Sequence, residues 1–345
     1  MKKHLAAPGN SLDKSESKDK EKKGKKNNET VIIPKGTNFN EPEEKKVWTG
    51  EELVNLNVKT IPCLLEPLFP QVGLSCLAGS SDTGKSTLLR QFAVAVITGQ
   101  QEFLGFKINA THHKAIIVST EDDPTAISYL LNRKEYEPGK MAGLRFLFDS
   151  MELITLLNSE LTKEPADLLI IDCFADAYGN DLKDTNKIRN YLHPMHQLAL
   201  KHRCSVVFIH HTAKRTEERE PSKNNLLSGQ GFEAKTRLVM ELRTDATNPN
   251  HRHLCIVKAN YLPPEFKNES YILEFDREAF EFRNTGERTP FESLAKSDDG
   301  GKAKYEQAKE LQKQGHTLEQ IAPMMGYANK SGVSKLISRF EKKVS

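Results

Sequence analysis

Four short apolar runs stand out in the first two thirds of the chain, at 74–78, 115–118, 168–171 and 205–209. Each is aliphatic or rich in β-branched residues and lacks alternating polar positions, which is typical of strands covered on both faces. Stretches with helical spacing separate them, at 86–98, 124–134 and 185–202, and Pro194 is expected to kink or divide the last of these. Strands that alternate with helices predict an α/β fold with a mainly parallel sheet and right-handed crossovers.

Near Arg237 the pattern changes, because strand-like runs then follow one another without helices between them. These runs lie at 236–242, 253–258, 271–275 and 279–283, and short polar turns link them. Runs of this kind indicate antiparallel neighbours. We therefore expect an antiparallel extension of the sheet, and one α/β domain that spans residues 47–283.

The segments that flank this domain differ from it in composition. Residues 1–46 are rich in Lys, Glu, Ser and Asn and hold few large apolar side chains, so we expect a disordered arm. Residues 284–302 are polar and contain Gly300-Gly301, which indicates a linker, and residues 303–345 have the pattern of a small all-helical module.

Charge and cysteine content restrict the class of protein. The formal net charge of +3 divides into +4 for residues 1–46, +5 for residues 302–345 and −6 for the rest, so nucleic acid would meet the ends first. For the arm alone, solubility is the simpler explanation of the lysines. No apolar run comes close to the length of about 18 residues that a membrane-spanning helix needs. The five cysteines form no Cys-x-x-Cys pair, so we expect reduced, buried thiols and a cytoplasmic location.

A phosphate-binding loop follows the first apolar run. The pattern Gly-x-x-x-x-Gly-Lys-Ser comprises Gly79, Ser80, Ser81, Asp82, Thr83, Gly84, Lys85 and Ser86, and Thr87 continues it into a helical run. In this strand–loop–helix context, backbone N–H groups and the helix N-terminus surround a phosphate, whereas a chance glycine-rich turn needs no such flanks. Lys85 would reach the β- and γ-phosphates and Ser86 would ligate Mg²⁺, so ATP with Mg²⁺ is the expected ligand.

Polar residues that follow the other apolar runs predict a hydrolysis site at one sheet edge. Asp172 ends its run and is expected to hold Mg²⁺ rather than only cap a turn. Cys173 follows it where a catalytic Glu could stand, so another carboxylate must orient water. Glu121 lies at the tip of a neighbouring strand, an arrangement that resembles the RecA-like motor ATPases, and we assign it as general base, with Asp122 as the alternative.

Two histidines follow the run at 205–209. We expect His211 to sense the γ-phosphate, whereas His210 is equally well explained as a structural strand-end histidine. No Cys pair or His-Glu-x-x-His motif supports a zinc site at these positions.

The order of these motifs along the chain resembles that of the RepA-type hexameric helicases of plasmid replication, which belong to the RecA/DnaB class. The resemblance covers about residues 48–283 and rests on the phosphate loop, Glu121, Asp172 and His211. The resemblance implies ring-shaped homo-oligomers, nucleotide at subunit interfaces and central loops that grip single-stranded DNA, here near 174–187 and 212–231. It also implies a cation supplied by the neighbouring subunit, for which Arg237 is the first candidate and Lys258 the second. Each could equally be an ordinary charge beside a strand.

Residues 303–342 resemble a helix-turn-helix. The pattern predicts helices at 303–314, from Thr317 onward and at 330–340, with a capping box at Thr317. An outward face would offer Lys330, Ser331, Ser334, Lys335 and Arg339 to duplex DNA. A three-helix module that docks on a protein is the alternative.

Together these features predict an ATP-hydrolysing, DNA-associated motor of the RepA type, acting in plasmid or mobile-element replication or transfer. The alternatives are a DNA-bound ATP-dependent switch that does not unwind DNA, and an ATPase that serves a protein complex.

Overall fold

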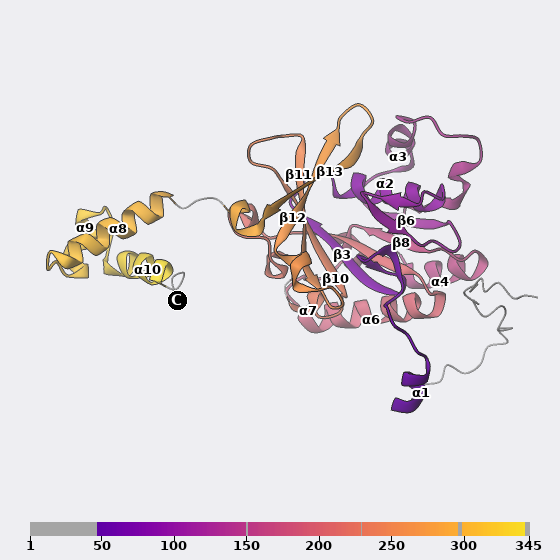
Figure 1. Cartoon of the computed structure of the whole chain (residues 1–345), viewed down its shortest axis with the longest axis horizontal. Helices are drawn as coiled ribbons and strands as arrows, with labels where there is room; N and C mark the ends of the chain where they lie inside the picture. Colours follow the sequence, from indigo (N-terminus) through magenta and orange to yellow (C-terminus); the bar gives the residue numbers. More distant parts are fainter. Residues whose placement is uncertain (1–46, 150, 229, 296–298, 342–345) are drawn as a thin grey trace, which may run out of the picture. The chain divides into compact units, whose positions relative to one another are not determined.

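The computed structural model describes residues 47–149, 151–228, 230–295 and 299–341 (Figure 1). The chain divides into two compact units, of which the first ends at Val58 and the second begins at Lys59. In the first, α1 (Gly50–Asn55) starts with a capping box, since the Thr49 side chain accepts from Glu52 N and the Glu52 side chain accepts from Thr49 N. The predicted arm at 1–46 lies outside the described residues.

A mixed sheet forms the centre of the second unit. Within the described residues it has nine strands in the order β13-β12-β11-β10-β3-β9-β8-β6-β7. The strands are β3 (Gly73–Gly79), β6 (Ala115–Ser119), β7 (Leu144–Leu147), β8 (Leu168–Asp172), β9 (Ser205–His211), β10 (Leu238–Thr244), β11 (His251–Ala259), β12 (Glu269–Asp276) and β13 (Glu281–Pro290). From β10 to β7 all neighbours are parallel, and β11, β12 and β13 are added antiparallel, as predicted.

Alternate strand residues pack on the two faces of the sheet, which explains the unbroken apolar runs. On β8, Leu168 and Ile170 belong to one core cluster and Leu169 and Ile171 to the other. The first face is covered by α2 (Lys85–Ile97), with α3 (Pro124–Leu131) nearby in Figure 1. The second face is covered by α4 (Leu153–Lys163), α5 (Phe174–Tyr178) and α6 (Thr185–His202), and α7 (Gln230–Glu233) packs on α6. Helix α6 runs unbroken through Pro194, contrary to the expected division.

Several elements were not predicted from the sequence. A second, four-stranded sheet has the order β2-β1-β5-β4, from strands β1 (Cys63–Glu66), β2 (Phe69–Pro70), β4 (Glu102–Phe103) and β5 (Phe106–Ile108). Strand β7 and helix α4 were also not predicted. Strand β13 corrects the expected domain end at 283 and linker start at 284, since it pairs with β12 as far as Pro290. It is an edge strand with many exposed side chains, so its sequence is polar and looks like a linker.

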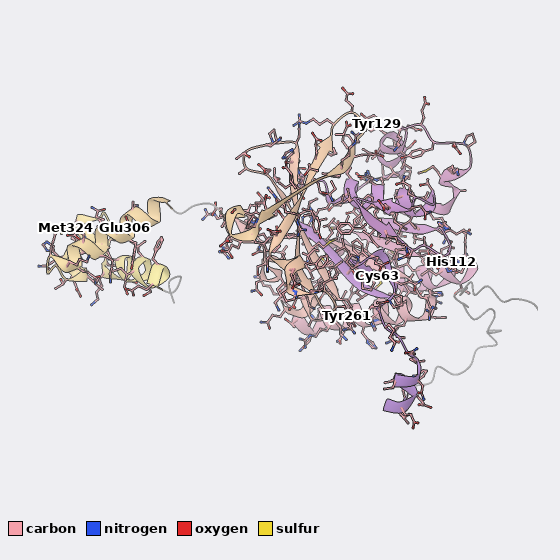
Figure 2. All side chains as sticks on the ribbon, in the orientation of Figure 1. Cys63, His112, Tyr129, Tyr261, Glu306 and Met324 are labelled. Atoms are coloured by element: carbon pink, nitrogen blue, oxygen red, sulfur yellow. The ribbon has the colours of Figure 1, made fainter. Side chains whose placement is uncertain are left out.

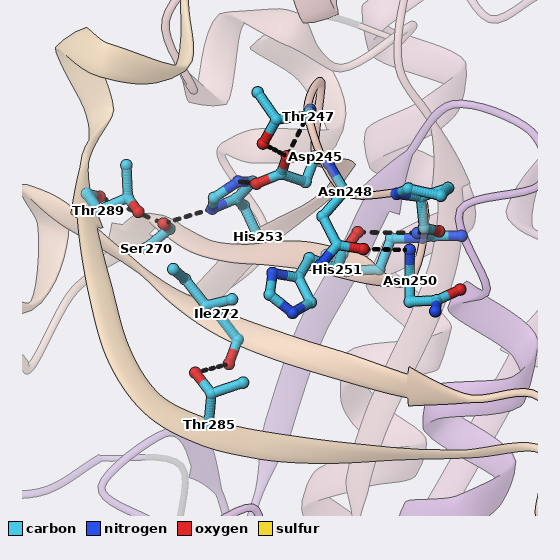
Figure 3. A network of polar contacts seen from close by, with 12 residues as sticks. Asp245, Thr247, Asn248, Asn250, His251, His253, Ser270, Ile272, Thr285 and Thr289 are labelled. Carbon is cyan, nitrogen blue, oxygen red and sulfur yellow. Dashed lines mark hydrogen bonds and ion pairs between the residues drawn. The ribbon is translucent and has the colours of Figure 1, made fainter.

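A polar network joins the antiparallel strands to one another (Figure 3). His253 Nε2 lies 2.8 Å from Asp245 Oδ2, and its Nδ1 lies 3.0 Å from Ser270 Oγ. The Ser270 hydroxyl in turn donates to Thr289 O at 3.2 Å. Burial alone would raise the pKa of Asp245, but hydrogen bonds from Thr247, Asn248 and His253 hold it well below its usual value. This network fixes the hairpin from which Arg252 reaches the phosphate loop.

The C-terminal residues form three helices, α8 (Asp299–Lys313), α9 (Leu318–Met324) and α10 (Lys330–Glu341). Their core includes Ala308, Ile321, Ala322, Val333 and Ile337. The predicted capping box is present at Thr317, and Gly326 has the positive φ of +74° expected of a residue that leaves a helix. Met324, labelled in Figure 2, is 55% exposed on this module. Among the residues that the structure describes, no helix is long and apolar enough to cross a membrane.

Candidate nucleotide site

The phosphate loop connects β3 to α2, and both of its glycines are required by their surroundings. Gly84 has φ +90°, and a Cβ there would lie 2.7 Å from the Phe282 ring. A Cβ on Gly79 would lie 2.5 Å from the carbonyl oxygen of Leu242. The loop therefore keeps its backbone close to two neighbouring strands, with its N–H groups at the start of α2.

A cavity of about 550 Å³ opens beside this loop. It brings together four of the predicted residues from different elements, namely Lys85, Glu121, Asp172 and His211. The remaining lining comprises Ser81, Asp82, Gly84, Ser86, Thr87, Ile209, Arg252, Phe275, Phe280 and Phe282. A space of this size, with charged and polar side chains on one side and three phenylalanines on the other, suits a small polar ligand such as a nucleotide.

Lys85 lies at the base of this cavity and is 6% exposed. Burial lowers the pKa of its ammonium group, against the attraction of Asp172 and Glu121, which raises it. Its Nζ donates to Ser80 O at 2.7 Å, which holds the side chain over the loop. The ammonium is thus desolvated and aimed where a phosphate would sit, as a phosphate ligand requires.

Asp172, at the end of β8, is 8% exposed, and its Oδ1 has no hydrogen-bond partner in the described part of the chain. Burial raises its pKa to about 6; the Ser86 hydroxyl opposes this, and the charge of Glu121 adds to it. A buried carboxylate oxygen without a partner, beside a serine hydroxyl, fits a hard divalent cation. Ser86 and Asp172 would hold Mg²⁺, which would neutralise phosphate charge when bound.

The raised pKa of Asp172 predicts that Asp172→Asn increases stability. The pKa of this carboxyl group is 3.8 in the unfolded chain and about 6 in the folded one. Its ionisation therefore begins to lower the stability of the folded state as the pH rises above 3.8, and the loss is complete above pH 6. The cost is up to about 3 kcal/mol at pH 8. Thermal unfolding without nucleotide or Mg²⁺ should show a higher Tm for Asp172→Asn at pH 8 and a smaller difference at pH 4.5. An equal or lower Tm at pH 8 would show that the buried charge is compensated.

Glu121 and His211 lie next to each other on the lining of the cavity. Glu121 is half exposed, and its Oε1 lies 3.8 Å from His211 Nε2. Asp122, the alternative base, lies 3.7 Å from Arg90, and Asp123 caps α3 by accepting from Ala126 N. Asp122 and Asp123 thus have structural partners, and of these three adjacent acids only Glu121 lines the cavity.

His210 differs from His211, because it points into the core. It is fully buried, its Nε2 lies 2.7 Å from Ser228 Oγ, and its ring packs on Phe174 and Phe232. Burial lowers its pKa to about 3, so it is neutral. The structural interpretation therefore holds for His210.

An aromatic wall of Phe275, Phe280 and Phe282 was missed by the sequence analysis. Phe275 packs on both other rings, at centroid distances of 5.3 Å and 4.9 Å. Gln91 of α2 binds the Phe282 backbone on both sides, accepting from its N–H and donating to its C=O. Phe280 has φ +56° in the β12–β13 turn, an uncommon conformation for a bulky residue and one typical of functional turns.

Arg252, also missed, completes this side of the cavity. Its Nε donates to Thr83 O at 3.0 Å, so its guanidinium contacts the phosphate loop from β11. Like the phenylalanines, it is remote from the loop in sequence, and no local motif marks it.

The remaining predicted residues lie away from the cavity. Arg237 is exposed at the start of β10, at the sheet edge opposite the phosphate loop of its own chain, with its N–H donating to Leu74 O. Lys258 donates to Glu233 O and Thr236 O within the same chain. On α10, Lys330, Ser331, Ser334 and Lys335 are exposed, and Lys330 pairs with Glu319 at 2.7 Å. The side chain of Arg339 lies outside the described residues.

The aromatic side chains in or next to the two segments predicted to grip DNA offer no exposed ring on which a base could stack. Phe174, Tyr178 and Phe232 are all buried. The second segment is tied to the domain, since Glu217 accepts from the Ser80 hydroxyl and Asn225 donates to Glu241 at 3.0 Å. This segment is therefore in direct contact with the phosphate loop.

The chain was compared with curated proteins, solved structures and protein families. No curated protein matches the chain. A solved structure of an ATPase domain matches with a TM-score of 0.50 at 14% identity, over 68% of this chain and 95% of that one, which confirms the expected RecA-like P-loop α/β fold. The family described as AAA domain matches residues 41–217, more than half of the chain, including the phosphate loop, Glu121, Asp172 and His211. The chain therefore belongs to the AAA domain family.

Proposed function

We propose that this protein hydrolyses ATP in the cavity beside its phosphate loop. The observation that carries the proposal is the convergence of Lys85, Asp172, Glu121 and His211 on one space from different elements. Lys85 binds the β- and γ-phosphates, and Glu121 accepts a proton from the attacking water. His211, next to both Glu121 and the loop at 212–218, contacts the γ-phosphate and couples its loss to that loop.

We further propose that ATP turnover drives action on DNA, as in the RepA-type motors that the sequence resembles. A homo-oligomeric ring would place Arg237 of one subunit at the nucleotide of the next. Its position on the edge opposite its own phosphate loop, exposed to solvent, suits a role in trans. Single-stranded DNA would bind to the loops after β8 and β9. Duplex DNA would bind to the exposed Lys330, Ser331, Ser334 and Lys335 of α10, and Arg339 of the same helix would add to this contact.

A switch that binds DNA without unwinding it is the second candidate. The burial of Phe174, Tyr178 and Phe232 favours it, because strand-tracking proteins usually stack bases on exposed aromatic rings. The direct contact between Ser80 and Glu217 supplies a route from nucleotide to loop without strand movement.

One set of assays separates these functions. ATPase rate and strand unwinding are measured with and without single-stranded DNA, and duplex binding is compared between the unmodified protein, Lys335→Glu on α10 and Lys313→Glu on α8 as control. Stimulated hydrolysis with unwinding supports the motor. Hydrolysis without unwinding, and duplex binding that only Lys335→Glu weakens, supports the switch. Absence of any DNA effect contradicts both.

The aromatic wall predicts where the nucleobase binds. Stacking on an aromatic ring contributes about 1–3 kcal/mol, so Phe280→Ala should raise the Kd for ATP by about 5- to 150-fold. Binding of inorganic triphosphate, which has no base, should change less than about 2-fold. Calorimetry with both ligands checks this, with the remote Phe266→Ala as control, and equal losses for both ligands would contradict base stacking.

A further inference from the structure

Three side chains of mixed chemistry meet at the carboxyl edge of the sheet. Glu121 follows β6, Cys173 follows β8, and His211 ends β9. These strands are neighbours in the order β9-β8-β6 and run parallel, so their carboxyl ends emerge together. One carboxylate oxygen, the thiol sulfur and one imidazole nitrogen all lie within 4.8 Å of one another.

We propose that Glu121, Cys173 and His211 form a zinc site that inhibits ATP hydrolysis. A sulfur, a nitrogen and a carboxylate oxygen make up a ligand set typical of Zn²⁺, whereas Mg²⁺ prefers oxygen ligands alone. Zinc bonds of about 2.0–2.3 Å place the ligand atoms of a tetrahedral site about 3.3–3.8 Å apart. Glu121 Oε1 and His211 Nε2 already lie 3.8 Å apart, and both lie within 4.8 Å of the Cys173 sulfur. The Glu121 side chain is half exposed, so it can move closer to the sulfur when the metal binds.

The surroundings of Cys173 support this assignment. Asp176 Oδ2 lies 3.6 Å from Cys173 Sγ and accepts from the Thr120 hydroxyl at 3.3 Å, so a second carboxylate is held beside the sulfur. The thiol donates to this carboxylate, which can therefore take up the proton that Cys173 loses when zinc binds and pass it on. On binding, zinc displaces the thiol proton to the solvent, and three protein ligands leave the fourth position open to water.

Zinc would inhibit hydrolysis because it would bind the two side chains that we assign to the reaction, Glu121 and His211. A Glu121 carboxylate bound to zinc cannot accept a proton from water, and a zinc-bound His211 cannot contact the γ-phosphate. Lys85 and the loop amides are not ligands, so nucleotide still binds while turnover stops. The inhibitory effect rests on the proposed ATPase function, but zinc binding itself does not.

Cobalt substitution tests the site without any need for hydrolysis. Full-length protein, freed of metal and kept reduced with a non-chelating phosphine, is titrated with Co²⁺. We expect a near-ultraviolet thiolate-to-cobalt band that saturates at one ion per chain and disappears when Zn²⁺ is added. Cys173→Ser should abolish the band, and Cys63→Ser should retain it. Cys63 is a half-buried thiol on β1 of the four-stranded sheet (Figure 2), whereas the triad lies at the ends of strands of the nine-stranded sheet.

A second readout is inhibition. The zinc concentration that halves the ATPase rate should rise at least about 10-fold in Cys173→Ser, with each variant compared with its own zinc-free rate, and a chelator should restore activity. Absence of the cobalt band in the unmodified protein overturns the proposal, as does a band that survives in folded Cys173→Ser. If ATPase activity is absent but the band behaves as expected, the site stands and the proposed function fails.

Discussion

Lys85→Ala will reduce ATP binding and hydrolysis by at least about 100-fold. The Lys85 ammonium is 6% exposed and desolvated, so its attraction to phosphate charge is strong in this setting. Loss of one charge-assisted contact of this kind costs about 3 kcal/mol or more in transition-state stabilisation. No other described lysine lines the cavity, so no neighbour can replace it.

The measurement is steady-state ATPase activity together with calorimetric titration of a non-hydrolysable ATP analogue. Lys107→Ala, an exposed lysine on β5, is the matched control and should leave both quantities within about 2-fold. Circular dichroism checks that Lys85→Ala is folded. If folded Lys85→Ala retains analogue affinity and turnover, the cavity is not the nucleotide site.

Glu121→Gln will keep ATP binding and lose turnover, with kcat lower by about 100- to 10,000-fold, the usual contribution of a general base. Glutamine has the size of glutamate and keeps a carbonyl oxygen for the contact with His211, but it cannot accept a proton from water. Binding depends mainly on Lys85 and the loop amides, so the Kd for the ATP analogue should change little.

Single-turnover hydrolysis and analogue binding, measured on the same preparation, separate these two effects. Asp122→Asn is the matched control, because that carboxylate is directed at Arg90. It should lower kcat by less than about 10-fold. A kcat for Glu121→Gln within a few-fold of the unmodified protein would assign the base elsewhere, and a large loss in Asp122→Asn alone would assign it to Asp122.

The parts of the fold that were predicted from sequence are those with a strong local signal. Unbroken apolar runs indicated the strands β3, β6, β8 and β9, because residues on both faces of these strands are buried. A capping box indicated the start of a helix at Thr317, before α9. The short strand β1, which has four residues, gave no such signal. Nor did the second half of β13, because an edge strand needs few apolar residues.

The candidate site divides in the same way. The sequence by itself determined the phosphate loop with Lys85 and Ser86, because those residues are adjacent in the chain and their spacing is set by the loop's own backbone. It also placed Glu121, Asp172 and His211 at one edge, since parallel strands bring their carboxyl ends together.

Only the tertiary structure decided which side chains complete the cavity. Phe280, Phe282 and Arg252 reach it from strands and a turn more than 150 residues beyond the phosphate loop. Cys173 meets Glu121 and His211 only through the order of three strands. Local patterns report burial and backbone conformation within a few residues. Which distant strand ends become neighbours depends on how the whole sheet is assembled.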